Sequence, residues 1–486
     1  MEDKYGKKSV VKNISWKLFE RGASLTVTFV VTIVLARLLD PSDFGLAAMV
    51  TVFVALSTIF VTSGLGNSLI QKKDADELDF FSIFWLNLGV SIVLYLILFA
   101  TAPLIAEFFG YPQLSPMLRV LSLRLLVAAV NSILCAYISK NMMFRYYFFS
   151  TLSSKIASGV VGIIMALMGY GVWALIGQSL SVLLFETSVL WLKIKWRPQK
   201  IFSWERTKVL YSFAWKIMLM SFVEAINDQL RNMFIGKKYS SGSLAYYDKG
   251  ALFPNNIVTN ISSSLSAVMF PVLSNVQDDR NRVLTLCRRW TSVFAYCAFP
   301  ILAGLIVAAQ PCITVLLSEK WLPSVPFLQL SCGAYAVWII EIPIRETVKS
   351  MGYANICLKM QVIKSLFALT VLLLVMDFGV MTIAVSALGC GLFNIVVSVF
   401  YGNKYARYKP LLLLQDIAPT MVLSFLMCVC IYAVLWLDLS AIFSLLLQIV
   451  VGIATYTGAS IISKNENFRY FAQLLEGIFQ GKRHVA

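Results

Sequence analysis

The chain alternates between long apolar runs and short polar stretches that are rich in lysine and arginine. A helix needs about 20 apolar residues to cross a bilayer, and by that measure the pattern predicts about 14 transmembrane helices. Their expected extents are 14–39, 42–70, 80–106, 115–139, 147–168, 172–193, 210–235, 250–276, 290–310, 325–348, 358–377, 380–402, 414–437 and 440–462. The connections are short, and the predicted fold class is an all-α polytopic membrane protein.

Three sequence features recur at an offset of about 200 to 210 residues, as internal repeats of transporters do. Ser15-Trp16-Lys17 recurs as Ala214-Trp215-Lys216, Gly169-Tyr170-Gly171-Val172 as Asp377-Phe378-Gly379-Val380, and Pro116 with Leu121-Ser122 as Pro326 with Leu330-Ser331. Six helices per repeat is an even number, so both halves keep one orientation. The repeat therefore predicts two six-helix bundles related by an axis along the membrane normal, with a cavity between them and two further C-terminal helices.

These patterns divide the chain into five expected parts. They are a tail at 1–13, an N-terminal bundle with its linker at 14–209, a C-terminal bundle at 210–409, two helices at 410–462, and a tail at 463–486. Phe468, Phe471, Leu474, Leu475, Ile478 and Phe479 recur at helical spacing in the last part. That tail is expected to be either an amphipathic helix on the membrane surface or a simple extension.

Composition and charge agree with a membrane protein. The chain is 59% apolar, only 14% charged, and has a mean hydropathy of +0.77. Its net charge of +16 comes from short basic clusters between apolar runs, which is a topology signal and not the mark of a nucleic-acid partner. Basic residues fall in alternate loops and in both termini, whereas the other loops hold Lys237, Lys238, Lys249 and Lys320. The expected location is a membrane, which the chain crosses many times, with both termini cytoplasmic.

Several classes of chemistry find no support in the sequence. The single histidine is His484, and the nine cysteines include no CxxC pair, so no metal site and no cofactor are expected. No GxxxxGK[ST] sequence for ATP binding occurs, and the loops predicted to lie outside are too short for a catalytic domain. We expect a protein that is not an enzyme, and the bilayer is its first partner.

Charged residues inside the apolar segments are the candidate site, because each costs at least about 2.5 kcal/mol at the centre of a bilayer unless it faces a cavity or a partner. The candidate cations for lining a cavity are Arg21, Arg124, Arg231 and Arg345. The candidates for ion coupling or for lining the cavity are Glu20, Glu224, Asp228, Glu341 and Lys364. Glu186 in the segment 172–193 is a further charge of this kind. The structural alternatives are pairing of Asp228 with Arg231, pairing of Lys364 or of Glu186, and movement of Arg21 toward the headgroups.

Several short motifs occur along the chain in the same order as in one known family. They are Leu35-Ala36-Arg37 with Pro41 and Asp43-Phe44-Gly45, Gly64-Leu65-Gly66-Asn67-Ser68-Leu69-Ile70-Gln71, Phe84-Trp85-Leu86-Asn87, Tyr246-Tyr247 with Lys249-Gly250, Phe270-Pro271-Val272-Leu273-Ser274, and Glu319-Lys320-Trp321 with Pro326 and Leu328-Gln329. In order and spacing the chain resembles the Wzx-type polysaccharide flippases of the multidrug/oligosaccharidyl-lipid/polysaccharide exporter superfamily, in particular the colanic acid and teichuronic acid exporters. Arg231 is a departure, since many relatives carry an acidic residue there, and it leaves the coupling ion open.

The resemblance implies an exporter that moves an undecaprenyl-pyrophosphate-linked oligosaccharide from the inner to the outer leaflet by alternating access, for surface polysaccharide biosynthesis. The resemblance also implies a location in the bacterial cell membrane. The partners would be that lipid-linked oligosaccharide and polysaccharide polymerase machinery. Arg21, Arg124, Arg231 and Arg345 would bind the pyrophosphate in the cavity. Two rivals from the same superfamily are a cation-coupled multidrug antiporter and a lipid II flippase. A membrane glycosyltransferase or polymerase is the rival of another class.

Overall fold

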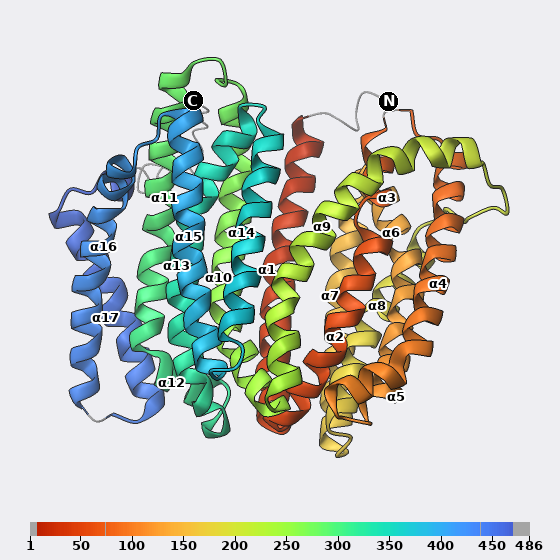
Figure 1. The fold of residues 1–486 in the computed structure, drawn as a ribbon, viewed down its shortest axis with the longest axis horizontal. Helices are drawn as coiled ribbons and strands as arrows, with labels where there is room; N and C mark the ends of the chain where they lie inside the picture. The colour runs from red at the N-terminus through yellow and green to blue at the C-terminus, as the bar shows by residue number, and fades with distance from the viewer. Residues whose placement is uncertain (1–6, 73, 438, 470–486) are drawn as a thin grey trace. The chain divides into compact units, whose positions relative to one another are not determined.

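The computed structural model describes residues 7–72, 74–437 and 439–469, and in this part of the chain every regular element is a helix (Figure 1). The first ten helices are α1 (Lys7–Leu38), α2 (Pro41–Thr62), α3 (Leu65–Gln71), α4 (Glu77–Phe109), α5 (Leu114–Ser122), α6 (Arg124–Lys140), α7 (Phe144–Leu167), α8 (Val172–Lys193), α9 (Trp204–Lys238) and α10 (Ser241–Ser274). The others are α11 (Arg280–Val307), α12 (Ala309–Leu316), α13 (Val325–Ser350), α14 (Ala354–Val375), α15 (Val380–Ala406), α16 (Pro410–Ala433) and α17 (Ala441–Ile462). Short 3₁₀ helices cover Glu319–Ser324 and Val434–Leu437.

Thirteen helical segments of the described chain are long and apolar enough to cross a membrane. The predicted segment 210–235 lies within α9 and is not one of the thirteen. At 35 residues α9 is long enough, but Lys216, Glu224, Asp228 and Arg231 interrupt its apolar stretch. The prediction of about 14 transmembrane helices and an all-α fold is confirmed.

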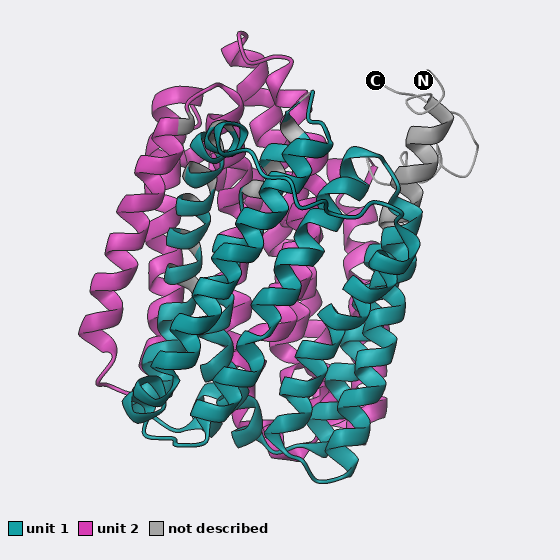
Figure 2. Ribbon diagram, turned by 90° about the vertical axis from the view of Figure 1, so that its right-hand side faces the viewer, with its two compact units in different colours: residues 1–245 teal, residues 246–486 magenta. Residues whose placement is uncertain are grey.

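The chain divides into two compact units, residues 1–245 and 246–486, which Figure 2 shows in different colours. In unit 1, α7 packs on α8 and on α1, while α2 contacts α6 and α9. In unit 2, α13 packs on α15 and α11, and α16 packs on α11 and α17. The turn that recurs in the sequence, at 169–172 and at 377–380, precedes one helix in each unit. Gly171 and Gly379, both at positive φ, stand directly before α8 and α15.

The predicted helix 42–70 is wrong as a single element, because the chain breaks between α2 and α3. Gly64 has a φ of +139°, which residues with a side chain rarely adopt. A Cβ on Gly64 would also lie 2.7 Å from the carbonyl oxygen of Ala214. The break therefore lets the chain turn tightly against α9. The predicted helix 115–139 is likewise divided into α5 and α6, where the Ser122 hydroxyl donates to the Arg119 carbonyl at 3.0 Å.

Arg119 compensates for a proline inside α4. Pro103 has no N–H, so the carbonyl of Phe99, four residues earlier, loses its helical donor. Arg119 Nε donates to that carbonyl at 3.3 Å, and its guanidinium lies 4.5 Å from the centre of the Phe99 ring. Arg119 thus joins α5 to α4 in a structural role.

Arg119→Met is expected to lower the free energy of unfolding by about 1 kcal/mol, the usual worth of such a hydrogen bond. In a Pro103→Ala background the loss should be smaller, because the new backbone N–H at 103 can satisfy the Phe99 carbonyl. Denaturant unfolding of the four proteins in detergent measures this coupling. An equal loss in both backgrounds would show that Arg119 does not act through the proline.

The two C-terminal helices are held to α11 by polar contacts. Pro300 frees the Tyr296 carbonyl, and the Tyr456 hydroxyl of α17 donates to it at 3.1 Å. Arg288 donates from Nε and Nη2 to Asp416 of α16, at 3.0 and 2.7 Å. The Tyr408 hydroxyl donates to the second oxygen of the same carboxylate at 2.9 Å, and the Asp416 side chain is buried. Helices α16 and α17 are therefore an integral part of unit 2.

Candidate functional site

Four charged side chains from four helices of unit 1 form what we term the unit 1 charge cluster, which comprises Glu20 of α1, Arg124 of α6, Lys155 of α7 and Glu186 of α8. Glu186 interacts electrostatically with the other three. Ser24 Oγ donates to Glu20 Oε1 at 3.1 Å, and Lys155 Nζ donates to the Ser24 carbonyl at 3.5 Å. Two acids and two bases balance, which lowers the cost of placing them among apolar helices.

Arg124 is the cation of this cluster that makes the shorter hydrogen bond to a neighbouring helix. It is partly buried near the start of α6, and its Nη1 donates to Ser179 Oγ of α8 at 2.8 Å. A guanidinium has five N–H donors, and the Ser179 contact uses one of them. Arg124 can therefore hold a serine and still present donors to a carboxylate or a phosphate.

Lys155 is the member of the cluster that the sequence prediction missed. It is the only charged residue of α7 beyond Arg145 in the first turn, and its side chain is partly buried. The signal that could have revealed it is its counterpart in the other repeat. Lys155 and Lys364 lie 209 residues apart, within the offset at which the repeat features recur.

Lys364 lies in a closed buried pair in unit 2. Its Nζ donates to Glu341 Oε1 of α13 at 2.6 Å and to Ser398 Oγ of α15 at 2.7 Å. The exposed fractions of the Lys364 and Glu341 side chains are 5% and 4%. The two repeat-related lysines thus differ, because Lys364 is sealed against a carboxylate whereas Lys155 makes longer contacts and is only partly buried.

Arg345 lies one helical turn beyond Glu341 on α13. Its Nε is 4.0 Å from Glu346 Oε1, and Lys349 Nζ is 3.5 Å from Glu346 Oε2. Arg345 also interacts electrostatically with Lys364. The C-terminal part of α13 therefore carries a group of neighbouring charged side chains in unit 2.

The other predicted residues lie on α1 and α9. Arg21 is exposed on α1, next to Glu20, and Arg231 is partly buried on α9. The side chains of Glu224 and Asp228 lie outside the described residues, so their predicted roles stay predictions. Among the described residues no group of three or more His, Cys, Asp or Glu side chains is arranged to hold a metal ion.

The family-like motifs of unit 2 build a packing site. Tyr246 meets the buried Trp321 edge to face, with ring centres 6.1 Å apart. Tyr247 meets Phe327 in the same way at 6.0 Å. A Cβ on Gly250 would come within 2.5 Å of Phe327 Cβ, so only glycine allows this approach. These motif residues hold α10 against the 3₁₀ helix Glu319–Ser324 and the start of α13, which is a packing role.

The fold is shared with solved membrane transporters. The chain superposes on an inward closed lipid II flippase, MurJ, with a TM-score of 0.74 and 16% identity, covering 94% of this chain and 99% of that one. A multidrug resistance MATE family transporter in an inward-facing conformation matches with a TM-score of 0.61 and 12% identity, covering 79% and 94%. The class of protein is therefore a polytopic helical membrane protein with the MurJ and MATE fold.

The sequence comparisons define the family. Residues 34–326 match the model for the family described as polysaccharide biosynthesis protein, and the chain belongs to that family. It is 26% identical to the succinoglycan biosynthesis transport protein ExoT of Rhizobium meliloti (strain 1021), over 66% of this chain and 65% of that protein. It is 23% identical to the lipopolysaccharide biosynthesis protein WzxC of Escherichia coli (strain K12), over 83% and 84%. It is 24% identical to the teichuronic acid biosynthesis protein TuaB of Bacillus subtilis (strain 168), over 61% and 62%.

Proposed function

We propose that this protein moves a polyprenyl-pyrophosphate-linked oligosaccharide from the inner to the outer leaflet of the bacterial cell membrane, for surface polysaccharide biosynthesis. The observation that carries the proposal is the family match over residues 34–326, because its relatives are named for succinoglycan transport, lipopolysaccharide and teichuronic acid biosynthesis. A flippase requires no covalent chemistry on its substrate, only binding sites that open to alternate sides of the membrane.

The unit 1 charge cluster supports an anionic substrate. Arginine binds phosphate oxygens through a planar fork, and lysine adds a mobile point charge. A pyrophosphate would compete with Glu186 for Arg124 and with Glu20 for Lys155. Binding would thus exchange internal ion pairs for contacts with the head group, and release would restore them. Arg21, Arg231 and Arg345 are further cations for the same ligand in the proposed transport cycle.

Orientation and driving force complete the proposal. The basic loops and termini favour an orientation in which the N- and C-termini face the cytoplasm, where lipid-linked precursors are assembled. An inside-negative potential favours outward movement of an anion by about 2.3 kcal/mol per charge per 100 mV. The membrane potential can therefore contribute to export, and polysaccharide polymerase machinery on the outer face would consume the product.

Deletion of the gene tests this function in cells. We expect surface polysaccharide to be lost and the lipid-linked oligosaccharide to accumulate in the inner leaflet, with both defects corrected by the native chain. The leaflet is assigned by whether an external enzyme can release the glycan.

Two outcomes of this test would contradict the proposal. Sensitivity to cationic dyes with normal polysaccharide would favour the antiporter. Arrest of cell-wall precursors with normal polysaccharide would favour the lipid II flippase, the function named for the solved structure with the same fold.

A further inference from the structure

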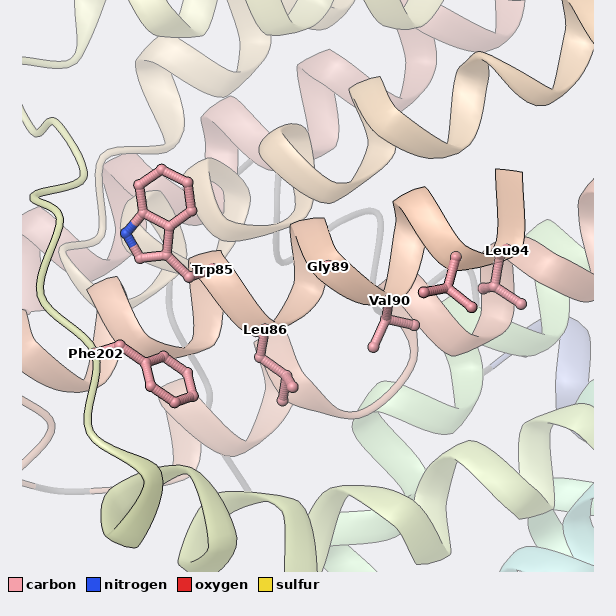
Figure 3. Close-up of a pocket in the computed structure, with 7 residues that line it drawn as sticks. Trp85, Leu86, Gly89, Val90, Leu94 and Phe202 are labelled. Carbon is pink, nitrogen blue, oxygen red and sulfur yellow. The ribbon is translucent and has the colours of Figure 1, made fainter. Parts of the chain in front are cut away.

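A shallow apolar groove of about 530 Å³ runs along α4 in unit 1. Its lining consists of Trp85, Leu86, Gly89, Val90, Val93 and Leu94, together with Phe202 from the segment that joins α8 to α9. Figure 3 shows Leu86 and Val90 along one side of α4, with the Phe202 ring reaching from the linker toward Leu86. Gly89 contributes no side chain, and a Cβ built there would meet nothing within 4 Å. The glycine therefore forms the floor of the groove.

The linker beside the groove is held in place by polar contacts. Trp85 Nε1 donates to the Gln199 carbonyl at 2.8 Å, and the Ser203 N–H donates to Ser82 Oγ at 3.0 Å. Just beyond, Arg206 pairs with Asp76, and this guanidinium lowers the pKa of the Asp76 carboxyl. Phe202 thus lies on a segment that is anchored to α4 on both sides.

The groove ends beside a strongly basic surface. The segment 193–208 carries six basic residues and one acidic residue, Glu205. Arg197 is occupied with backbone carbonyls, donating to those of Ile194 and Trp196 at 2.5 and 2.7 Å. Lys200 is exposed and lies between Gln199, which contacts Trp85, and Phe202, which lines the groove. An exposed cation therefore lies two residues from Phe202 in the groove lining.

We propose that this groove binds one acyl chain of an anionic phospholipid of the cytoplasmic leaflet, with Lys200 and the neighbouring linker lysines on its phosphate. From Trp85 to Leu94 the groove follows α4 for about 14 Å, close to the depth of one leaflet in a bilayer core about 30 Å thick. An acyl chain of leaflet length fits inside it, whereas a long polyprenyl tail would extend beyond it. The proposal does not depend on the transported substrate.

Quenching of Trp85 by brominated lipid chains tests this site. The full chain is placed in phosphatidylcholine vesicles that contain a minor share of dibrominated phosphatidylglycerol or, in the control, dibrominated phosphatidylcholine. The Trp85 signal is the difference between the native chain and Trp85→Phe. We expect several-fold stronger quenching by the anionic lipid, since each basic residue near a membrane surface favours anionic lipids about fivefold.

Matched variants separate the groove from general membrane contact. Gly89→Leu fills the groove and should remove the excess quenching, whereas Gly389→Leu, at an equally open and exposed glycine of α15, should leave it unchanged. Lys200→Gln should reduce the preference about fivefold, and Lys359→Gln, at an exposed lysine of α14, should not.

Three results would overturn the proposal: equal quenching by the two lipids, quenching that survives Gly89→Leu, or displacement of the phospholipid by an equal amount of polyprenyl phosphate. The first and third need no groove variant, so the test holds even if Gly89→Leu does not fold. All of these measurements report lipid binding, so their outcome does not depend on whether the protein transports the proposed substrate.

Discussion

Lys364→Met is expected to lower the free energy of unfolding by about 3–5 kcal/mol, because it leaves the Glu341 carboxylate buried without its partner. The pair is short, at 2.6 Å, and both side chains are almost fully enclosed by α13, α14 and α15. The double variant Lys364→Met with Glu341→Leu removes both charges and should recover most of that loss. Thermal and denaturant unfolding in detergent measure the three proteins against the native chain.

Lys349→Met provides the matched control. Lys349 is exposed at the end of α13 and also faces a carboxylate, that of Glu346 at 3.5 Å. Its substitution should change stability by less than about 0.5 kcal/mol, as surface substitutions do. If the two lysine variants were equally stable, the Glu341 and Lys364 pair would not be the structural element that we describe.

Arg124→Leu and Lys155→Leu are each expected to slow transport of the pyrophosphate-linked substrate about 10- to 150-fold, the range given by a lost charged hydrogen bond of about 1.5–3 kcal/mol. Arg124→Lys should retain only part of the activity, because an ammonium cannot offer the two-point fork. Initial rates at a series of substrate concentrations separate weaker binding from slower movement. Lys359→Gln, an exposed lysine on α14, should transport like the native chain.

A structural role for the unit 1 charge cluster would give a different result. If Arg124 and Lys155 only neutralise Glu20 and Glu186, the variants should lose thermal stability, and pairing each with the matching acid substitution should restore transport. If they bind the anion, the paired variants should remain slow. Full recovery of transport in Lys155→Leu with Glu20→Leu would contradict the binding role.

The sequence predicts most of the helices because apolar runs of bilayer length leave few alternatives. The breaks inside those runs were missed, since they depend on contacts between distant segments. Gly64 turns against Ala214, and Arg119 serves the carbonyl that Pro103 frees in another helix. The pattern of hydropathy along the chain predicts neither of these two contacts.

The candidate site was predicted only in part. Glu20, Arg124, Glu341 and Lys364 were selected because charged residues are rare inside apolar segments. In the structure each of them has polar or charged neighbours. The same rule could not separate the closed pair of Lys364 from the more open cluster of Arg124. Lys155 meets the same rule but was not selected, and its repeat counterpart Lys364, 209 residues later, is the further signal in the sequence that identifies it.

The central claim is that the protein flips an anionic lipid-linked glycan, and reconstituted translocation tests it most directly. Proteoliposomes with the native chain receive a fluorescent polyprenyl-pyrophosphate oligosaccharide in one leaflet, under an imposed membrane potential, and appearance in the other leaflet is followed by quenching. We predict transfer well above that of empty liposomes, faster when the potential favours movement of the anion, and strongly reduced in Arg124→Leu. Transfer no faster than in empty liposomes across a panel of glycans, together with uptake of cationic dyes, would contradict the account.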